Sequence, residues 1–263
     1  MNLVSSLLLK SESIFSGAVG IAMLALLVAL GVFAVLSTIY HWVIVFRYRG
    51  YNRIMVGCNL SAEESAKNLL ASLGYQDVKV STMNFFAEWF FGNHYNPKKN
   101  TIYLRKNIIN SKSITAIAIA TKLVAQVEST KKGDKKVRSR QVMSYFGFFA
   151  PIILLPMIAL GIVLDVTILN TIGVFTIIFT VVSLSYFVFG LVAMSLNIKI
   201  EKASSARAIE FFKETHLLTD EEIDTAQQLY RTYIVSAIMD YVYTILYIVW
   251  FIFRLIWKIF TRK

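Results

Sequence analysis

The sequence predicts a multi-pass α-helical membrane protein, with about four spans and a small α+β domain between the first two. Of its 263 residues, 56% are hydrophobic and only 16% are charged, and the mean hydropathy is +0.59. Soluble domains typically contain about 25% charged residues, so the composition argues against a soluble single-domain enzyme. The single cysteine, Cys58, excludes an internal disulfide framework and a Cys-based zinc finger.

Four apolar runs are each long enough to supply the roughly 20 helical residues that cross a bilayer. They cover residues 17–46, 145–164, 172–197 and 233–253. A short turn around Asp165 and Asn170 separates the second run from the third, which predicts a membrane hairpin. The first run lacks the short apolar region and cleavage site of a signal peptide, so we interpret it as a retained anchor.

These runs divide the chain into five parts. We expect an N-terminal membrane helix, a soluble domain, a membrane hairpin, an amphipathic helical segment, and a C-terminal membrane helix with a basic tail. They correspond in that order to residues 1–46, 47–144, 145–197, 198–232 and 233–263.

The positive charge of the chain is concentrated in the soluble domain. Residues 47–144 contain 17 Lys and Arg against 6 Asp and Glu, a net charge of +11. The positive-inside rule therefore predicts that this domain is cytoplasmic and that the protein resides in the cell membrane. With four spans the basic tail from Arg254 would lie outside, against the same rule, so either the last segment does not cross fully or the domain outweighs the tail.

Within the soluble domain, local patterns predict individual elements. Ser61 and Glu64 form a capping-box pattern before an amphipathic helix that ends at Gly74. Residues 78–80 and 101–104 alternate as strands do, and residues 93–97 between them have the composition of a turn. Ser113 precedes an apolar helix over residues 114–127, and we expect residues 129–140 to form a loop.

Two further segments of this region predict surfaces. The basic run from Lys131 to Arg140 adjoins a membrane span, so attraction to anionic lipid headgroups is a simpler explanation than binding of nucleic acid. The aromatic cluster over residues 85–91 has three alternatives: insertion into the bilayer surface, a cover over a cleft, or a packed core.

Three motifs in this order resemble the bacterial YugP-type neutral zinc metallopeptidases. They are Asn93-His-Tyr-Asn-Pro97 with the strand at 101–104, the Ala- and Ile-rich helix after Ser113, and Glu201-Lys-Ala-Ser-Ser-Ala-Arg-Ala208. The resemblance covers most of the chain from Ser61 onward. It implies a small zincin-like domain, further membrane spans and a zinc-dependent peptidase site.

The sequence departs from this family at the metal-binding motif. The resemblance places the H-E-A-G-H positions on residues 122–126, where Lys122, Leu123 and Gln126 replace the two ligand histidines and the general base. The remaining family ligand corresponds to Glu201. One carboxylate does not hold a zinc ion, which takes three or four protein ligands. We therefore predict a degenerate active site with no resident metal.

Several single residues keep two interpretations. His94 is either a remote zinc ligand or substrate contact, with Tyr95 beside it in the cleft, or a histidine that hydrogen-bonds locally. Glu201 either pairs with Lys122 across the former metal site or is an exposed carboxylate, and Lys122 itself is otherwise a surface residue. Asp240 is either a functional intramembrane carboxylate or a group close enough to the interface to reach water.

The family resemblance together with the loss of the catalytic motif predicts a non-hydrolytic relative. Such a pseudoenzyme would bind a peptide or membrane protein partner as a scaffold component. The first alternative is an active membrane-bound zinc metallopeptidase that uses His94, Glu201 and another acidic residue as ligands. The second is a small transporter or channel component built on Asp240 and the proline-containing second span.

Overall fold

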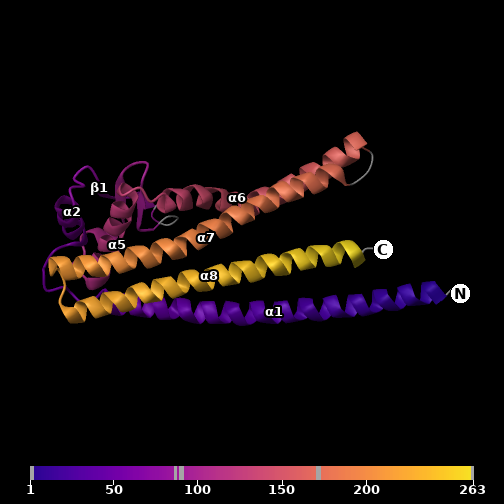
Figure 1. Cartoon of the computed structure of the whole chain (residues 1–263), viewed down its shortest axis with the longest axis horizontal. Helices are drawn as coiled ribbons and strands as arrows, with labels where there is room; N and C mark the ends of the chain where they lie inside the picture. Colours follow the sequence, from indigo (N-terminus) through magenta and orange to yellow (C-terminus); the bar gives the residue numbers. More distant parts are fainter. Residues whose placement is uncertain (1–2, 86–87, 89–91, 170–172, 262–263) are drawn as a thin grey trace. The chain divides into compact units, whose positions relative to one another are not determined.

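The computed structural model describes residues 3–85, 88, 92–169 and 173–261, and most of these residues are helical. The chain forms two compact units. One unit contains α1 (Leu3–Tyr51) up to Val43 and α8 (Asp220–Thr261) from Ile238. The other contains residues Ile44–Ala237, with the small sheet and the remaining helices. Figure 1 shows α1 and α8 as long unbroken helices.

Three helices in the described part of the chain are long and apolar enough to cross a membrane. They are Gly20–Tyr51, Val174–Thr215 and Asp220–Phe251. The expected span over residues 145–164 lies on α6 (Lys136–Leu164), where only the shorter apolar helix Pro156–Leu169 is found among the described residues. The apolar helices support membrane association, whereas a total of four spans is not confirmed.

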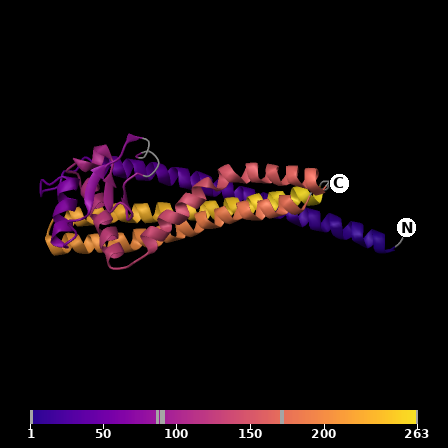
Figure 2. The same ribbon diagram turned by 90° about the horizontal axis from the view of Figure 1, so that it is seen from above.

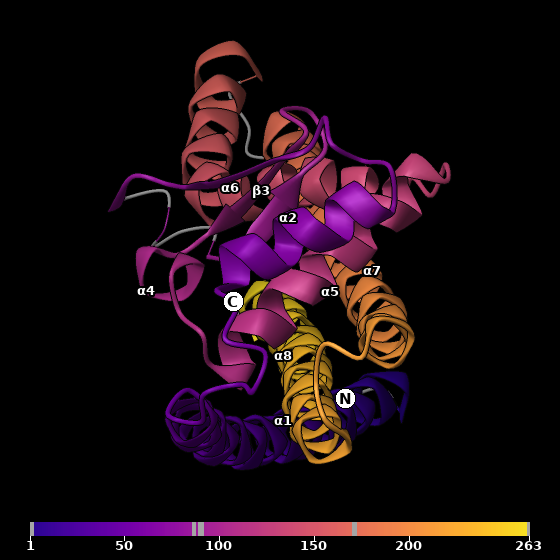
Figure 3. The ribbon, with the colours of Figure 1, turned by 90° about the vertical axis from the view of Figure 1, so that its left-hand side faces the viewer.

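The small sheet has three strands in the order β1-β3-β2. The central strand β3 (Thr101–Leu104) pairs in parallel with β1 (Lys79–Thr82) and antiparallel with β2 (His94–Asn96). The helix α5 (Ile114–Lys131) packs against β2, β3 and α2 (Ala62–Ser72), and Figure 3 shows this arrangement. The short helix α4 (Lys106–Ile109) follows β3.

The local signals for α2 and α5 are confirmed. The Ser61 hydroxyl accepts a hydrogen bond from the Glu64 amide while the Glu64 carboxylate accepts one from the Ser61 amide, which completes the capping box. Gly74 follows α2 with a positive φ of 77°, as a C-terminal cap residue requires. The Ser113 hydroxyl caps α5 by accepting from the Ala116 amide.

Two expectations about loops are wrong. Residues 94–96 form β2 rather than a turn, and the turn follows at residues 97–100. Residues 129–140 are mostly helical, because α5 continues to Lys131 and α6 begins at Lys136. In the aromatic cluster, Phe86, Ala87 and residues 89–91 lie outside the described part, while Phe85 is 74% exposed.

The helices α6 and α7 (Val174–Thr215) lie side by side as a hairpin (Figures 1 and 2). A Cβ atom on Gly147 of α6 would come within 2.6 Å of the Gly190 Cα atom of α7, so the two backbones approach closely at this point. The helix α7 continues past the apolar region to Thr215, and α8 starts at Asp220. The segment expected as a separate amphipathic helix over 198–232 is therefore shared by these two long helices.

Asp165 is not a turn residue as the sequence suggested. It lies in a π-helical turn (Asp165–Leu169) that continues α6, and its side chain is fully buried. Its carboxylate accepts hydrogen bonds from the amides of Gly173, Phe175 and Thr176 and from the Thr176 hydroxyl. Since the first amides of a helix have no partner within the helix, Asp165 caps the start of α7.

Candidate functional site

The positions that the family resemblance assigns to the metal motif lie on α5, inside the second unit. Residues 114–128 of this helix are all buried, because α2, the sheet and α7 contact it. Lys122, Leu123 and Gln126 are therefore interior residues, with exposed fractions of 8%, 3% and 2%. The alternative that Lys122 is an ordinary surface lysine is wrong.

Lys122 pairs with Glu201 of α7. The Lys122 Nζ atom donates a hydrogen bond to the Glu201 Oε2 atom over 2.7 Å, and the two side chains are only 10% and 14% exposed. The interpretation that these two residues pair is thus the one that the structure confirms. A nearly buried ion pair has little compensation from water, so each charge depends on the other.

Two tyrosines of α8 complete the surroundings of the Lys122 ammonium. The Nζ atom lies 4.8 Å from the ring centroid of Tyr233 and 6.0 Å from that of Tyr230. Tyr230 is held in place because its hydroxyl donates a 2.6 Å hydrogen bond to the Ala118 carbonyl of α5. One carboxylate and two aromatic faces therefore stabilise the cation.

The remaining motif positions supply no base and no imidazole. Leu123 packs in the hydrophobic core of the small domain. The Gln126 Oε1 atom is buried and has no hydrogen-bond partner among the described residues, and the same is true of the Ser205 Oγ atom, one helical turn after Glu201. Such unsatisfied polar atoms are costly and uncommon in a folded interior.

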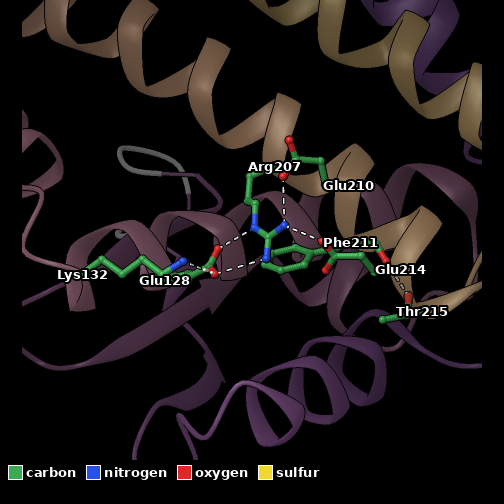
Figure 4. Close-up of polar contacts among 7 residues, drawn as sticks. All are labelled: Glu128, Lys132, Arg207, Glu210, Phe211, Glu214 and Thr215. Carbon is green, nitrogen blue, oxygen red and sulfur yellow. Dashed lines mark hydrogen bonds and ion pairs between the residues drawn. The ribbon is translucent and has the colours of Figure 1, made fainter.

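A second charged cluster joins the end of α5 to α7 (Figure 4). The Arg207 guanidinium donates to both carboxylate oxygens of Glu128, over 2.8 and 3.3 Å, and also contacts Glu210 and Glu214. Its carbon lies 4.1 Å from the centroid of the Phe211 ring. Lys132 approaches Glu128 to 2.8 Å.

Glu128 is the buried member of this cluster, with a side chain only 6% exposed. Burial alone would raise the pKa of Glu128, but the hydrogen bonds from Arg207 and Lys132 outweigh it and hold the pKa below its ordinary value. Glu128 therefore stays ionised and ties α5 to α7. The sequence signal for this role is a lone acidic residue near the end of an apolar helix.

His94 and Tyr95 occupy the edge strand β2. The His94 Nδ1 atom lies 3.1 Å from the Gly92 carbonyl, which matches the interpretation of a locally bonded histidine. Burial lowers the pKa of His94, so the neutral imidazole predominates at pH 7. Tyr95 is a core residue with 2% exposure, and its hydroxyl donates to the Asn100 side chain.

Asp240 belongs to the other unit, on α8. Asp240 is exposed, and its backbone carbonyl accepts a hydrogen bond from the Thr244 hydroxyl. The structure places Asp240 in a different unit from the cluster formed by Lys122 and Glu201.

The residues at the motif positions do not fit a zinc ion. Lys122 and Gln126 occupy the positions of the two imidazole ligands, and Leu123 occupies the position of the carboxylate base. Glu201 is therefore the one anionic ligand among these positions. Within the described ranges, no group of three His, Cys, Asp or Glu side chains is arranged to hold a metal ion. The ligand set of His94, Glu201 and a further acid is thus not found in that part of the chain.

Comparison with known proteins identifies the family of this chain. Residues 26–256 match the family model described as "Putative neutral zinc metallopeptidase", which is most of the chain. No curated protein and no solved structure matches. The match includes α5 and α7, which carry Lys122 and Glu201. The chain belongs to the neutral zinc metallopeptidase family.

Proposed function

We propose that this chain is a catalytically degenerate member of its family that acts as a binding or scaffold component in the membrane. The salt bridge between Lys122 and Glu201 carries the proposal. It joins two positions that the resemblance assigns to metal ligands, and a monovalent ammonium now balances the carboxylate there. A zinc ion at the same place would meet strong repulsion from the Lys122 charge.

The general base is missing as well. A zinc peptidase needs a carboxylate that takes a proton from the metal-bound water, and the corresponding position holds Leu123, a core residue. The buried side chains instead stabilise the contact between α5 and α7. In the proposed scaffold role, the protein binds a peptide or a partner protein without cutting it.

The environment of the proposed site is the cytoplasmic surface of the cell membrane. The net charge of +11 over residues 47–144 supports this side, because cytoplasmic loops are enriched in Lys and Arg. The basic run from Lys131 to Arg140 would attract anionic lipid headgroups there. Loss of every membrane partner in a crosslinking pull-down would count heavily against the scaffold role.

Zinc stoichiometry is the first test. We expect the purified, detergent-solubilised protein to contain close to no zinc by elemental analysis. The matched control is the triple variant Lys122→His, Leu123→Glu, Gln126→His, which restores both histidines and the glutamate of the motif on α5 and should bind about one equivalent, given the remaining ligand Glu201.

Each outcome of this test separates the hypotheses. About one equivalent of zinc in the unmodified protein would contradict the proposal and support an active peptidase. Loss of that zinc in Glu201→Ala or His94→Ala would then identify the ligands. Zinc in the triple variant alone would support the assignment of Lys122, Gln126 and Glu201 to the former metal site. A triple variant that folds but takes up no zinc would contradict that assignment.

A further inference from the structure

Two helices of membrane-spanning length each carry a single acidic, basic or histidine side chain within an apolar stretch. In α1 this residue is His41, which is alone in residues 13–46. In α8 it is Asp240, which is alone in residues 232–253. Both helices are long and apolar enough to cross a membrane. Because ionisable groups are costly inside a bilayer, such residues commonly mark functional sites.

The two side chains lie at a similar depth from flanking arginines. His41 precedes Arg47 by six residues, about 9 Å of helix, and Asp240 follows Arg231 by nine residues, about 14 Å. Arginines at the ends of apolar helices lie at the level of the lipid headgroups. Since the apolar core of a bilayer is about 30 Å thick, both groups fall inside it.

Two hydrogen bonds of the second unit define how α1 and α8 are aligned there. The Tyr51 hydroxyl donates to the Gln228 side chain over 2.9 Å. The Arg47 guanidinium donates to the Thr232 hydroxyl over 3.0 Å. Four residues back along α1 thus correspond to four residues forward along α8, as in antiparallel neighbours. Two further steps of four residues lead to position 39 on α1 and position 240 on α8.

The other unit contains both His41 and Asp240, and there the two groups interact electrostatically. Among the described residues, His41 is the one charged group that acts on the Asp240 carboxylate, and no hydrogen bond or ion pair holds this carboxylate. His41 is two residues from position 39, about 3 Å of helix, so this interaction agrees with the alignment. The titratable side chains next to the pair in sequence are the phenols of Tyr40 and Tyr241, and phenols are neutral below about pH 8.

We propose that His41 and Asp240 form a coupled proton-binding pair within the membrane, which holds α1 against α8 while both groups are charged. Uptake of a proton by the carboxylate at lower pH removes its negative charge and ends the attraction. Loss of the proton from the imidazolium at higher pH does the same. Two groups that interact in this way titrate as a pair, each with a midpoint that depends on the other.

Protons reach the pair from the side of Arg47 and Arg231, which is the nearer end of the apolar stretch for both groups. No further acidic, basic or histidine side chain lies between the pair and the opposite ends of the two stretches. The pair is therefore a proton-binding site and not a path across the membrane. This inference goes beyond the proposed scaffold role, because neither residue belongs to the former metal site.

The first test is difference infrared spectroscopy of the full-length protein in neutral detergent, between about pH 3 and about pH 8. Loss of a carboxyl band in Asp240→Asn assigns that band to Asp240. We expect His41→Gln to shift the midpoint of the band by about one pH unit or more, a tenfold change in proton affinity. The matched control, His216→Gln, changes an exposed histidine outside the apolar stretches and should leave the midpoint unchanged.

A second test measures the attraction between the helices. In a Cys58→Ser background, spin labels on Ser37→Cys and Thr244→Cys lie one helical turn beyond the pair on each helix. The distance between the labels should be shorter and more narrowly distributed near neutral pH than at about pH 3. This change should be absent in Asp240→Asn and retained in Asp224→Asn, which alters an exposed carboxylate of α8 before its apolar stretch.

Either of two results would overturn the inference. One is a midpoint of the Asp240 band that His41→Gln does not change, which would mean that the two groups titrate independently. The other is a distance between the labels that does not depend on pH, which would mean that the charges do not hold the helices together. Neither result bears on the zinc content, so failure of this inference is distinguishable from failure of the proposed function.

Discussion

Lys122 and Glu201 are 79 residues apart in the sequence, yet their Nζ and Oε2 atoms lie 2.7 Å apart, nearly buried within the second unit. Both positions correspond to metal ligands in the family resemblance. This contact therefore supports the alignment of two separate motifs and also explains how the fold tolerates a buried lysine there. The ammonium supplies the positive charge that Glu201 needs.

Breaking this pair from one side should be strongly destabilising. Lys122→Met leaves the Glu201 carboxylate buried without a partner, and Glu201→Met leaves the ammonium in the same condition. We expect each single change to cost about 3 kcal/mol, whereas the double variant should recover most of that loss because no unpaired charge remains. Thermal unfolding of the detergent-solubilised protein measures the four members of this cycle.

The exposed pair of Lys67 and Glu63 on α2 is the control for that cycle. Its atoms are 2.6 Å apart, but its side chains are 57% and 28% exposed. Exposed pairs contribute less than about 1 kcal/mol, so Lys67→Met should be nearly neutral. If Lys122→Met were as mild as Lys67→Met, the pair would have no structural role.

The cluster around Arg207 predicts a dependence of stability on pH. Because the pKa of Glu128 is lowered in the folded protein, its ion pairs stabilise the fold at neutral pH and are lost as the pH falls through the lowered pKa. We expect Tm to fall as the pH drops below about 4.5, the ordinary pKa of a glutamate, and to continue falling through the lowered pKa of Glu128. In Arg207→Gln the protein should be less stable at pH 7, and this acid-dependent fall should be smaller.

Glu214→Gln provides the matched comparison for Arg207. Glu214 contacts the same guanidinium over 2.8 Å but is 55% exposed, so its loss should change neither the stability at pH 7 nor its acid dependence appreciably. If Tm depended on pH equally in Arg207→Gln and in the unmodified protein, the contact with Arg207 would not be the cause of the lowered pKa of Glu128.

Local signals predicted much of the small domain correctly. The capping box at Ser61 and the hydroxyl cap of Ser113 depend on atoms within a few residues, so the starts of α2 and α5 could be recognised in the sequence. The strand β2 could not, because three residues become a strand only by pairing with β3, and the composition around Pro97 indicates a turn.

Long-range contacts also limit how much of the site can be predicted from the sequence. The resemblance brought Lys122 and Glu201 together as members of one former metal site, and the structure confirms their pairing. Glu128 was missed, since its partner Arg207 is 79 residues away in the sequence.

Close packing in the hairpin predicts an effect of a single methyl group. A Cβ atom at Gly147 would lie 2.6 Å from the Gly190 Cα atom, and a backbone atom cannot move aside as a side chain does. Gly147→Ala should therefore separate α6 from α7 and lower Tm, even though alanine favours a helix by about 1 kcal/mol over glycine. Gly31→Ala, where a Cβ meets nothing within 4 Å, should be neutral or stabilising.

At the far end of the same hairpin, Asp165 predicts a local rather than a global effect. Its carboxylate accepts three amide hydrogen bonds and one from a hydroxyl at the start of α7, so Asp165→Ala leaves these donors unsatisfied. We expect a loss of about 2 kcal/mol, the upper end for an N-terminal cap. Amide hydrogen exchange should accelerate at Phe175 and Thr176.

Asp165→Asn separates charge from hydrogen bonding in this cap. The amide keeps one oxygen that accepts, but it loses both the second acceptor and the negative charge that favours a helix N-terminus. Exchange at Phe175 and Thr176 should therefore be intermediate between the unmodified protein and Asp165→Ala, while amides of α5, far from the cap in the sequence, keep their protection. Equal exchange in all three proteins would mean that water replaces the carboxylate at no cost and that α7 does not depend on Asp165 for its start.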